Sequence, residues 1–144
     1  MIRDFVPEDF DRVFEIIEES FPRDEHGTYE EHKKLLSDPA YKIYILADDE
    51  SRAIKGFMSI WDLEKAAHID HFAMAPEFRG RGFGKALFKK LAKVAVERDC
   101  GRLEWVCLNW NRPSIDFYLS MGARPMDEWT TYRLAGESLA KAAE

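Results

Sequence analysis

Three glycines alternate with larger residues in one short stretch of the sequence, and this spacing suits the binding of an anion. Gly80, Gly82 and Gly84 stand between Arg79 and Lys85. Because glycine has no side chain, several backbone N–H groups at the start of a helix can converge on one anion, and the helix dipole adds positive potential there. The stretch therefore predicts a phosphate-binding loop.

The loop differs from the two common nucleotide-binding motifs. A Walker loop requires glycine five residues before Gly84 and Ser or Thr after Lys85, whereas Arg79 and Ala86 occupy these positions. A dinucleotide fingerprint that starts at Gly80 requires Gly or Ala where Lys85 stands. Both nucleotide motifs are excluded.

Positive charge is concentrated at this loop in an otherwise acidic chain. The whole sequence has 21 Lys+Arg and 27 Asp+Glu, a net charge of −6. Residues 79–93 contain no acid, and their cations are Arg79, Arg81, Lys85, Lys89, Lys90 and Lys93. A glycine turn followed by a solvated basic helix would explain the pattern without a ligand. The strand predicted before the loop and the helix predicted after it favour the anion site.

The residues around the loop resemble a known family of enzymes. Residues 69–84 (IDHFAMAPEFRGRGFG) are similar to the acetyl-CoA signature of the GNAT acetyltransferases, whose core is Arg or Gln, two residues, Gly, one residue, and Gly or Ala. Residues 109–118 (NWNRPSIDFY), followed by Met121–Ala123, resemble the second signature of the family, most closely in its diamine acetyltransferase branch. The similarity spans roughly residues 54–134 and implies an acetyl-CoA-dependent N-acetyltransferase.

The resemblance implies a binding site for acetyl-CoA, the expected co-substrate. In the family, backbone amides of the loop hold the CoA pyrophosphate, and the matching residues are Arg79, Gly80, Arg81, Gly82, Phe83 and Gly84, with Lys85 just beyond. The preceding strand binds the pantetheine amides through its backbone, at the positions of Phe72, Ala73 and Met74. Asn111 and Ser114 match residues that contact the CoA arm, although both could equally cap the helix that follows.

Catalytic roles also follow from the resemblance. Tyr118 matches the tyrosine that protonates the departing CoA thiolate, and a phenol pKa of about 10, above the thiol value of about 8.5, keeps it protonated when the thiolate forms. The acceptor ammonium must lose a proton before it attacks, so a base is required. Asp70 stands where the diamine branch has a glutamate, and His68, on the same strand face, is the alternative base. His71 is expected on the opposite face unless a β-bulge turns it.

Alternating strands and helices must position these residues. Periodicity and turn signals predict strands at Met1–Phe5, Tyr41–Ala47, Ile54–Trp61, Ala66–Ala75, Leu103–Leu108 and Glu128–Leu134. They predict helices at Pro7–Phe21, Thr28–Leu36, Gly82–Arg98 and Pro113–Ser120, with a frayed helix after Ser138. The second of these helices is polar and is expected to be exposed. We expect an α/β fold of the GNAT type, with a mixed, mostly antiparallel central sheet, flanking helices and a CoA-binding strand-loop-helix.

Length and composition limit the remaining possibilities. With 144 residues, 46% of them hydrophobic, the chain suffices for one domain, residues 1–144. No apolar run is long enough to span a membrane, and Met1–Asp4 leads directly into charged sequence, so a cytoplasmic protein is expected. Cys100 and Cys107 are expected to be reduced core thiols, and no metal site is expected.

The main functional hypothesis is direct transfer of the acetyl group of acetyl-CoA, in a ternary complex, to a primary amine of a small cationic substrate that resembles a diamine or polyamine. The alternatives are a protein N-terminal or lysine acetyltransferase and a non-catalytic CoA-binding regulatory domain. The net charge disfavours nucleic-acid and membrane binding. By resemblance we expect a homodimer, with its interface near Trp129–Leu134.

Overall fold

The computed structural model describes residues 1–23, 26–63 and 66–144, which form two compact units, Met1–Val106 and Cys107–Glu144. The first unit contains β1 (Ile2–Asp4), α1 (Phe10–Ser20), α2 (Tyr29–Leu35), β2 (Tyr41–Ala47), β3 (Ile54–Leu63), β4 (Ala66–Met74), α3 (Phe83–Glu97) and β5 (Arg102–Glu104). Short 3-10 helices precede α1 at Pro7–Asp9 and follow β4 at Pro76–Phe78. The second unit contains α4 (Arg112–Ser120) and α5 (Glu137–Ala142).

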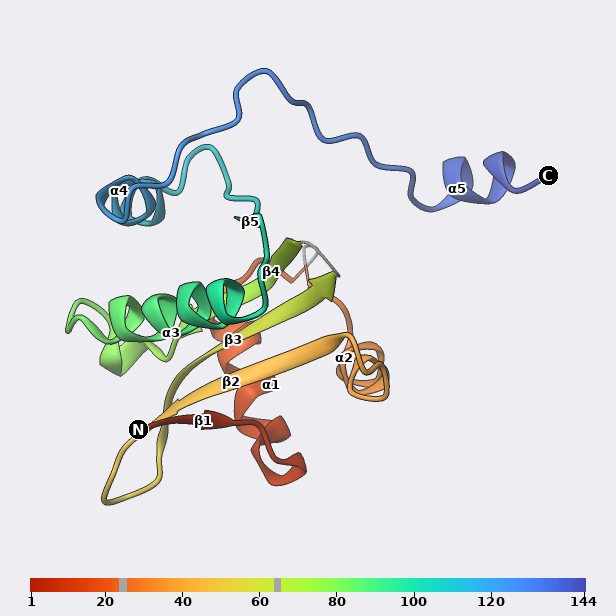
Figure 1. The fold of residues 1–144 in the computed structure, drawn as a ribbon. Coiled ribbons are helices and arrows are strands. Elements are labelled where there is room, and N and C mark those ends of the chain that lie inside the picture. The colour runs from red at the N-terminus through yellow and green to blue at the C-terminus, as the bar shows by residue number, and fades with distance from the viewer. Residues whose placement is uncertain (24–25, 64–65) are drawn as a thin grey trace. The chain divides into compact units, whose positions relative to one another are not determined.

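A five-stranded sheet in the order β1-β2-β3-β4-β5 forms the centre of the first unit. The first four strands pair antiparallel, and β4 pairs with β5 in parallel. Helices α1 and α2 lie on one face of the sheet and α3 covers the opposite face (Figure 1). Because helices cover both faces, β2 and β3 are largely buried on both sides. The expected α/β fold with a mixed, mostly antiparallel sheet is confirmed.

Helix α1 provides one layer of the hydrophobic core. Val13, Ile16 and Ile17 recur at helical spacing, are almost fully buried, and belong to one cluster with Ile45 and Phe57 of the sheet. Burial of one such side chain contributes about 1.5–3 kcal/mol. This layer therefore holds the end of α1 firmly over β3 and β4.

Helix α2 begins at the expected capping box but is less exposed than predicted. The Glu31 N–H donates to Thr28 Oγ1, and the Thr28 N–H donates to the Glu31 carboxylate. His32, however, is only 6% exposed, because it faces the sheet from the inner side of the helix. The prediction of an exposed helix is wrong at this position.

A β-bulge interrupts β4 at the position of the predicted base. Ser59 pairs with His71, whereas the next residue of β3, Ile60, pairs with Ile69. Asp70 is therefore an extra residue in β4 without a partner on β3. The bulge turns His71 onto the face that carries Asp70, which the uninterrupted alternation of a strand would not allow.

Strand β5 is shorter than the predicted strand Leu103–Leu108, and its last pair joins Glu104 to His68 of β4. The bulge at Asp70 lies just beyond this pair and bends β4, so the two strands separate. From the bulge to Met74, no strand in the described part of the chain pairs with this edge of β4.

The predicted final strand Glu128–Leu134 is wrong. These residues form a turn and irregular chain, and Trp129 and Tyr132 are 77% and 92% exposed. A strand requires a neighbour for its backbone hydrogen bonds, and β-favouring residues alone cannot replace that neighbour. The order of elements therefore ends with α4 and α5 instead of a strand.

The remaining elements agree closely with expectation. Helix α4 follows Asn111 as its N-cap, and Gly122, with a φ angle of 87°, comes just after the helix. Both cysteines are free thiols, but they are half-buried rather than part of the core. Among the helices of residues 1–23, 26–63 and 66–144, none has the length and apolar character that a membrane span requires.

Candidate active site

The predicted phosphate-binding loop lies between β4 and α3. Gly80 and Gly82 have φ angles of 69° and 80°, in the left-handed region that other residues rarely adopt. Gly82 is also the N-cap of α3, so the backbone N–H groups of the loop lie at the positive end of the helix dipole. A Cβ placed on either glycine would meet no described atom within 4 Å, so the loop faces open space. These features fit the binding of a pyrophosphate.

Gly84 has a structural role. A Cβ on Gly84 would lie 3.5 Å from Cζ of Phe72 and 3.9 Å from Cγ of Met74, which is ordinary van der Waals distance. The Cβ position of Gly84 therefore faces β4, and binding through its backbone N–H stays a prediction.

The three basic side chains of the loop are all exposed, and one of them is engaged in hydrogen bonds with described residues. Arg79 donates from Nε to the Met74 carbonyl at 2.9 Å and from Nη2 to Ser20 Oγ at 3.0 Å, so it ties the loop to β4 and α1. The Arg81 guanidinium lies 5.2 Å from the centre of the Phe83 ring, and both Arg81 and Lys85 are exposed. None of the three forms an ion pair with a described residue, so each contributes positive charge at the loop, and Arg81 and Lys85 are the two that also make no hydrogen bond there.

The backbone of Phe72, Ala73 and Met74 lies on the open edge of β4. The Phe72 ring is 6.1 Å from the Phe88 ring of α3, and Ala73 is buried in the core beneath α1. These side chains serve the core. Every second backbone N–H and C=O of an edge segment points away from the sheet and can bind an extended ligand as an added strand.

Asp70 is held by hydrogen bonds from two other side chains. Tyr41 donates its hydroxyl to Asp70 Oδ2 at 3.1 Å, and Nδ1 of His71 lies 3.0 Å from the same oxygen. Burial opposes ionisation of Asp70, but the hydrogen bond and charge of His71 and the hydrogen bond of Tyr41 outweigh it and lower the pKa of this carboxyl. Burial also raises the pKa of Tyr41, so its hydroxyl stays protonated and donates.

His68, the alternative base, lies on the same face and pairs with Trp61 of β3. Its side chain makes no hydrogen bond or ion pair with any residue that the structure describes, and it is partly exposed. Both candidate bases are thus on the α1 and α2 side of the sheet, but only Asp70 has a fixed position.

Sequence reasoning missed most of the surroundings of Asp70. Tyr41, Ser59 and His32 were not assigned any role, and the position of His71 depended on a bulge that the sequence pattern left open. The polar composition of the second helix gave no indication that His32 would be buried. The one useful signal was the pair of aspartate and histidine in consecutive positions.

The second unit carries the remaining predicted residues on α4 or at its start. Asn111 Oδ1 accepts a hydrogen bond from the Ser114 N–H at 3.3 Å, so Asn111 does cap this helix. The ring of Tyr118 lies 5.5 Å from that of Phe117. Burial, with a smaller contribution from Cys107, raises the pKa of Tyr118 to about 12, so its hydroxyl is protonated at neutral pH.

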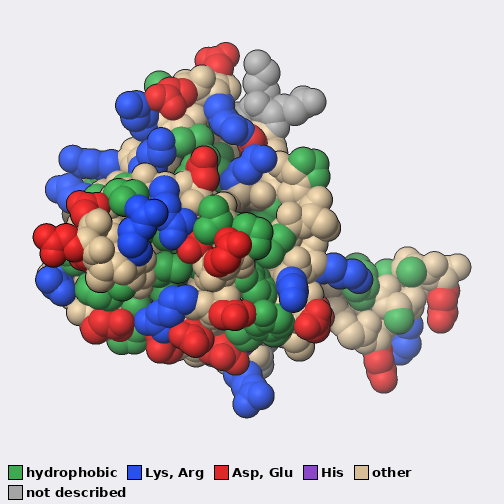
Figure 2. Space-filling model, turned by 90° about the horizontal axis from the view of Figure 1, so that it is seen from below, with side chains coloured by type: hydrophobic (Ala, Val, Ile, Leu, Met, Phe, Trp, Pro, Cys, Tyr) green, Lys and Arg blue, Asp and Glu red, His purple; other side chains and the backbone are tan. Residues whose placement is uncertain are grey.

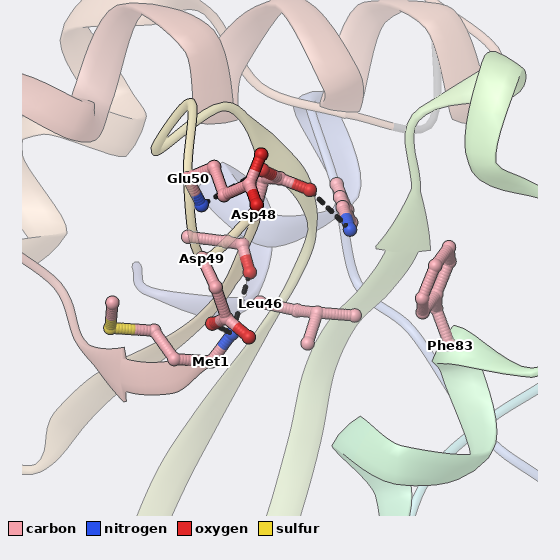
Figure 3. Close-up of a pocket in the computed structure, with 8 residues that line it drawn as sticks. Met1, Leu46, Asp48, Asp49, Glu50 and Phe83 are labelled. Atoms are coloured by element: carbon pink, nitrogen blue, oxygen red, sulfur yellow. Dashed lines mark hydrogen bonds and ion pairs between the residues drawn. The ribbon is translucent and has the colours of Figure 1, made fainter.

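A hollow of about 310 Å³ lies beside the start of α3 and receives acidic side chains from the turn between β2 and β3 (Figure 3). Asp48, Asp49 and Glu50 line it together with Lys55 and Phe83. Nζ of Lys55 is 2.7 Å from Asp48 Oδ2, so the charge of this lysine is already neutralised. The net acidic lining does not suit the phosphates of CoA.

Basic and acidic side chains are intermixed on the face of the molecule seen in Figure 2. No broad patch of one sign covers the part of the chain coloured in this view. That face therefore offers no continuous basic surface for a polyanion such as nucleic acid.

Residues 10–123 match the model of the Acetyltransferase (GNAT) family, over a stretch that includes the loop, the bulge and α4. The chain belongs to the GNAT family. This membership confirms the resemblance in residues 69–84 and 109–118 and the assignment to the acyltransferases. GNAT enzymes use acetyl-CoA as the acetyl donor.

Three GNAT relatives of this chain act on different amines, according to their names. The L-ornithine N5-acetyltransferase of Arabidopsis thaliana is 42% identical over 72 residues, which are 50% of this chain and 32% of that enzyme. The thialysine N-epsilon-acetyltransferase of Sus scrofa is 33% identical over 75 residues, which are 50% of this chain and 44% of that enzyme. A Bacillus subtilis protein with the provisional name ribosomal protein bS18-alanine N-acetyltransferase is 31% identical over 126 residues, 86% of this chain and 80% of that protein. The matches thus span less than half the length of the first two relatives.

A solved structure shares the fold of this GNAT protein. The integron cassette protein from the mobile metagenome of V. cholerae is 24% identical, with a TM-score of 0.81 over 100% of this chain and 97% of that one. At this identity the likeness supports the fold alone.

Proposed function

We propose that this chain transfers the acetyl group of acetyl-CoA to a primary amine of a small cationic molecule, directly in a ternary complex. One observation carries the proposal: the open edge of β4 leads into a loop with two left-handed glycines at the N-terminus of α3. Acetyl-CoA presents amide groups followed by a pyrophosphate. The strand edge suits the amide groups and the glycine loop suits the pyrophosphate, and the two follow each other in the same order.

The residues present fit acetyl-CoA. The open side of Gly80 and Gly82 leaves room for a pyrophosphate, and Arg81 and Lys85 supply free positive charge near it. The backbone of Phe72–Met74 is available for the pantetheine arm. When bound, acetyl-CoA supplies an activated thioester carbonyl.

Tyr118 is the proposed general acid. Its pKa of about 12 lies above that of a thiol, so Tyr118 carries its proton when the C–S bond breaks and can donate it to the departing sulfur. The hydroxyl is needed chiefly in the transition state, where negative charge develops on that sulfur.

Asp70 is the proposed binding group for the acceptor amine. Its lowered pKa keeps it a carboxylate, which attracts an ammonium group to the α1 and α2 side of the sheet. The rings of Tyr41 and Trp61 lie 5.0 Å apart on the same face and can contribute cation–π attraction. A second cationic group on the acceptor, as in ornithine, suits these surroundings.

Acetylation of a protein N-terminus is the second candidate. The Bacillus subtilis relative, named for acetylation of the alanine of a ribosomal protein, is covered over 80% of its length. An N-terminal amine has a pKa of about 7.7–8.0, so it requires less help from a base than a side-chain ammonium does.

We also propose that the two units act as one acetyltransferase domain, residues 1–144. The family match runs across the boundary between Val106 and Cys107, and the proposed acid and the proposed acceptor site come from different units. A homodimer stays a prediction.

Thiol release from acetyl-CoA, measured across a panel of diamines, ornithine, aminoglycosides and peptides with an N-terminal alanine, tests the function. We expect the highest kcat/KM with a diamine or diamino acid. Selective activity with the peptides would favour the second candidate instead. Calorimetric binding of CoA without thiol release from any acceptor would support a non-catalytic CoA-binding domain.

A further inference from the structure

Two histidines lie together beside the bulge, and the proposed function uses neither of them. The His71 and His32 rings are 5.1 Å apart and inclined by 58°. The His71 side chain is 13% exposed, and Phe21, just after α1, packs edge-on against its ring at 5.2 Å. His71 is thus held between Phe21, just after α1, and His32 of α2.

The hydrogen bonds of His71 determine which nitrogen carries its proton. Asp70 is a carboxylate and can only accept, so Nδ1 of His71, 3.0 Å away, must be the N–H donor. The backbone N–H of His71 donates to Ser59 Oγ at 3.1 Å and further fixes this residue on β4. In the neutral ring, Nε2 then carries the lone pair, and no hydrogen bond from the described residues reaches it.

Asp70 itself is a poor proton acceptor for an amine. The oxygen Oδ2 already accepts from both Tyr41 and His71, and the pKa of the carboxyl is lowered. An imidazole, with a reference pKa of about 6.5, matches the working pH far better than a carboxylate does.

We propose that Nε2 of His71 is the general base that deprotonates the acceptor amine, with Asp70 and His32 as positioning residues. This inference rests on the proposed function and assigns its base. One proton passes from the ammonium nitrogen to the Nε2 lone pair, and the amine keeps the electron pair of the broken N–H bond. The imidazolium, balanced by the Asp70 carboxylate, then gives its proton to water.

His32 supports this arrangement from the buried side. Its Nε2 is buried and has no hydrogen-bond partner among the residues that the structure describes. Burial, and the nearness of His71, lower the pKa of His32, so it stays neutral beside a protonated His71. A neutral ring adds no repulsion when the base takes up its proton.

The described groups around His71 come from four elements of the first unit. Among the described residues, Asp70 on β4 and His32 on α2 are the titratable side chains in contact with the His71 ring, and Tyr41 on β2 bonds to Asp70. The segment after α1 and strand β3 contribute Phe21, Phe57 and Ser59, which carry no charge.

Two substitutions of His71 both remove the proposed base at Nε2. His71→Asn keeps an N–H near the position of Nδ1 and loses Nε2, whereas His71→Gln places an amide near the position of Nε2. We expect both to lower kcat at pH 7 by about 100- to 10,000-fold and to recover activity in alkaline buffer, where more amine is already neutral. In Asp70→Asn, kcat should still fall on the acid side of its pH profile, but this fall should occur at lower pH than in wild type. His26→Gln is the control and should behave as wild type, because the His26 ring packs on Phe14 and not on His71.

Nitrogen NMR of the histidine rings in the protein without substrate gives a readout independent of activity. We expect His71 to be protonated at Nδ1 when neutral, and this preference to be lost in Asp70→Asn. His32→Phe should keep the fold and leave the tautomer of His71 unchanged, because the bond to Asp70 fixes that tautomer.

The inference is overturned if His71 carries its neutral proton at Nε2, or if the acid limb of kcat survives unchanged in His71→Asn and His71→Gln. Loss of that limb only in His68→Gln would assign the base to His68. If wild type releases no thiol with any amine, the proposed function fails, while the NMR result still decides whether Asp70 and His71 form the pair.

Discussion

Gly82 provides the sharpest test of the CoA site. Its left-handed backbone and the open space at its Cβ position both predict that an added side chain weakens the binding of CoA. Its φ angle is 80°, and a residue with a side chain held in such a conformation costs about 1–3 kcal/mol, most for a β-branched one. In Gly82→Val the free loop relaxes to another conformation, and binding must restore the left-handed one. That cost alone predicts roughly 5- to 150-fold weaker binding of CoA.

The added side chain should weaken binding further. A Cβ on Gly82 meets no described atom within 4 Å, so it projects into the space that a pyrophosphate would fill. For the same reason the variant should fold normally, since the side chain has no clash inside the protein. We therefore expect at least about 100-fold loss of CoA affinity for Gly82→Val with a small change in Tm.

Gly84→Ala is the matched control, two residues further along. Its Cβ would lie at an ordinary 3.5 Å from Phe72, and alanine in a helix is more stable than glycine by about 0.5–1 kcal/mol. Isothermal titration calorimetry with CoA should give a wild-type Kd for Gly84→Ala. A Kd within twofold of wild type for Gly82→Val would refute the assignment of this loop to CoA.

Tyr118→Phe should lower turnover roughly 10- to 1000-fold and leave the calorimetric Kd of CoA almost unchanged. Because the pKa of Tyr118 is about 12, the activity of the wild type should not decline between about pH 8 and pH 10 through loss of the Tyr118 proton. Gly56→Ala should destabilise the protein by roughly 1–3 kcal/mol in urea unfolding, since a Cβ there would stand 2.5 Å from Sδ of Met74 and 2.7 Å from the carbonyl oxygen of Ala73. An unchanged free energy of unfolding would contradict this close approach of β3 and β4. Asp9 is buried, which opposes its ionisation, yet two hydrogen bonds of 2.7 Å from Arg3 lower its pKa in the folded protein. The ionised Asp9 therefore stabilises the fold fully above about pH 4, the pKa of an unfolded aspartate, and this stabilisation is lost as the pH falls through the lower pKa of the folded state. Thermal unfolding of Asp9→Asn should therefore depend less on pH in that acidic range than wild type does, and equal slopes would count against the ion pair. Light scattering should give the mass of two 16.8 kDa chains, with Trp129→Ser weakening the dimer, whereas a monomer at every concentration would rule the dimer out.

Much of the first unit was predictable because its signals are local. The two glycines, the strand before them and the amphipathic helix after them lie within about thirty residues, and each obeys rules of backbone geometry and helix periodicity. The hairpin of β2 and β3 follows equally from two β-rich runs around a polar turn. The capping box at Thr28 was likewise readable from four consecutive residues.

The two errors in strand prediction share one physical cause. A strand exists only where a neighbouring strand accepts its hydrogen bonds, and this condition cannot be read from Trp129–Tyr132 or from Leu103–Leu108 alone. The first segment has no such neighbour among the described strands, and the second loses its neighbour where β4 bends at Asp70.

The sequence by itself determined the loop, its charge, the family resemblance and the type of residue at Asp70. Only the tertiary structure decided what surrounds that carboxylate. Tyr41, 29 residues earlier in the chain, reaches Asp70 through the register of two strand pairs, and His32 reaches His71 through the packing of α2 on the sheet. The bulge then sets which way His71 points, because one extra residue reverses the alternation of a strand. Such contacts depend on the summed geometry of many distant pairs, so no local pattern in the sequence specifies them.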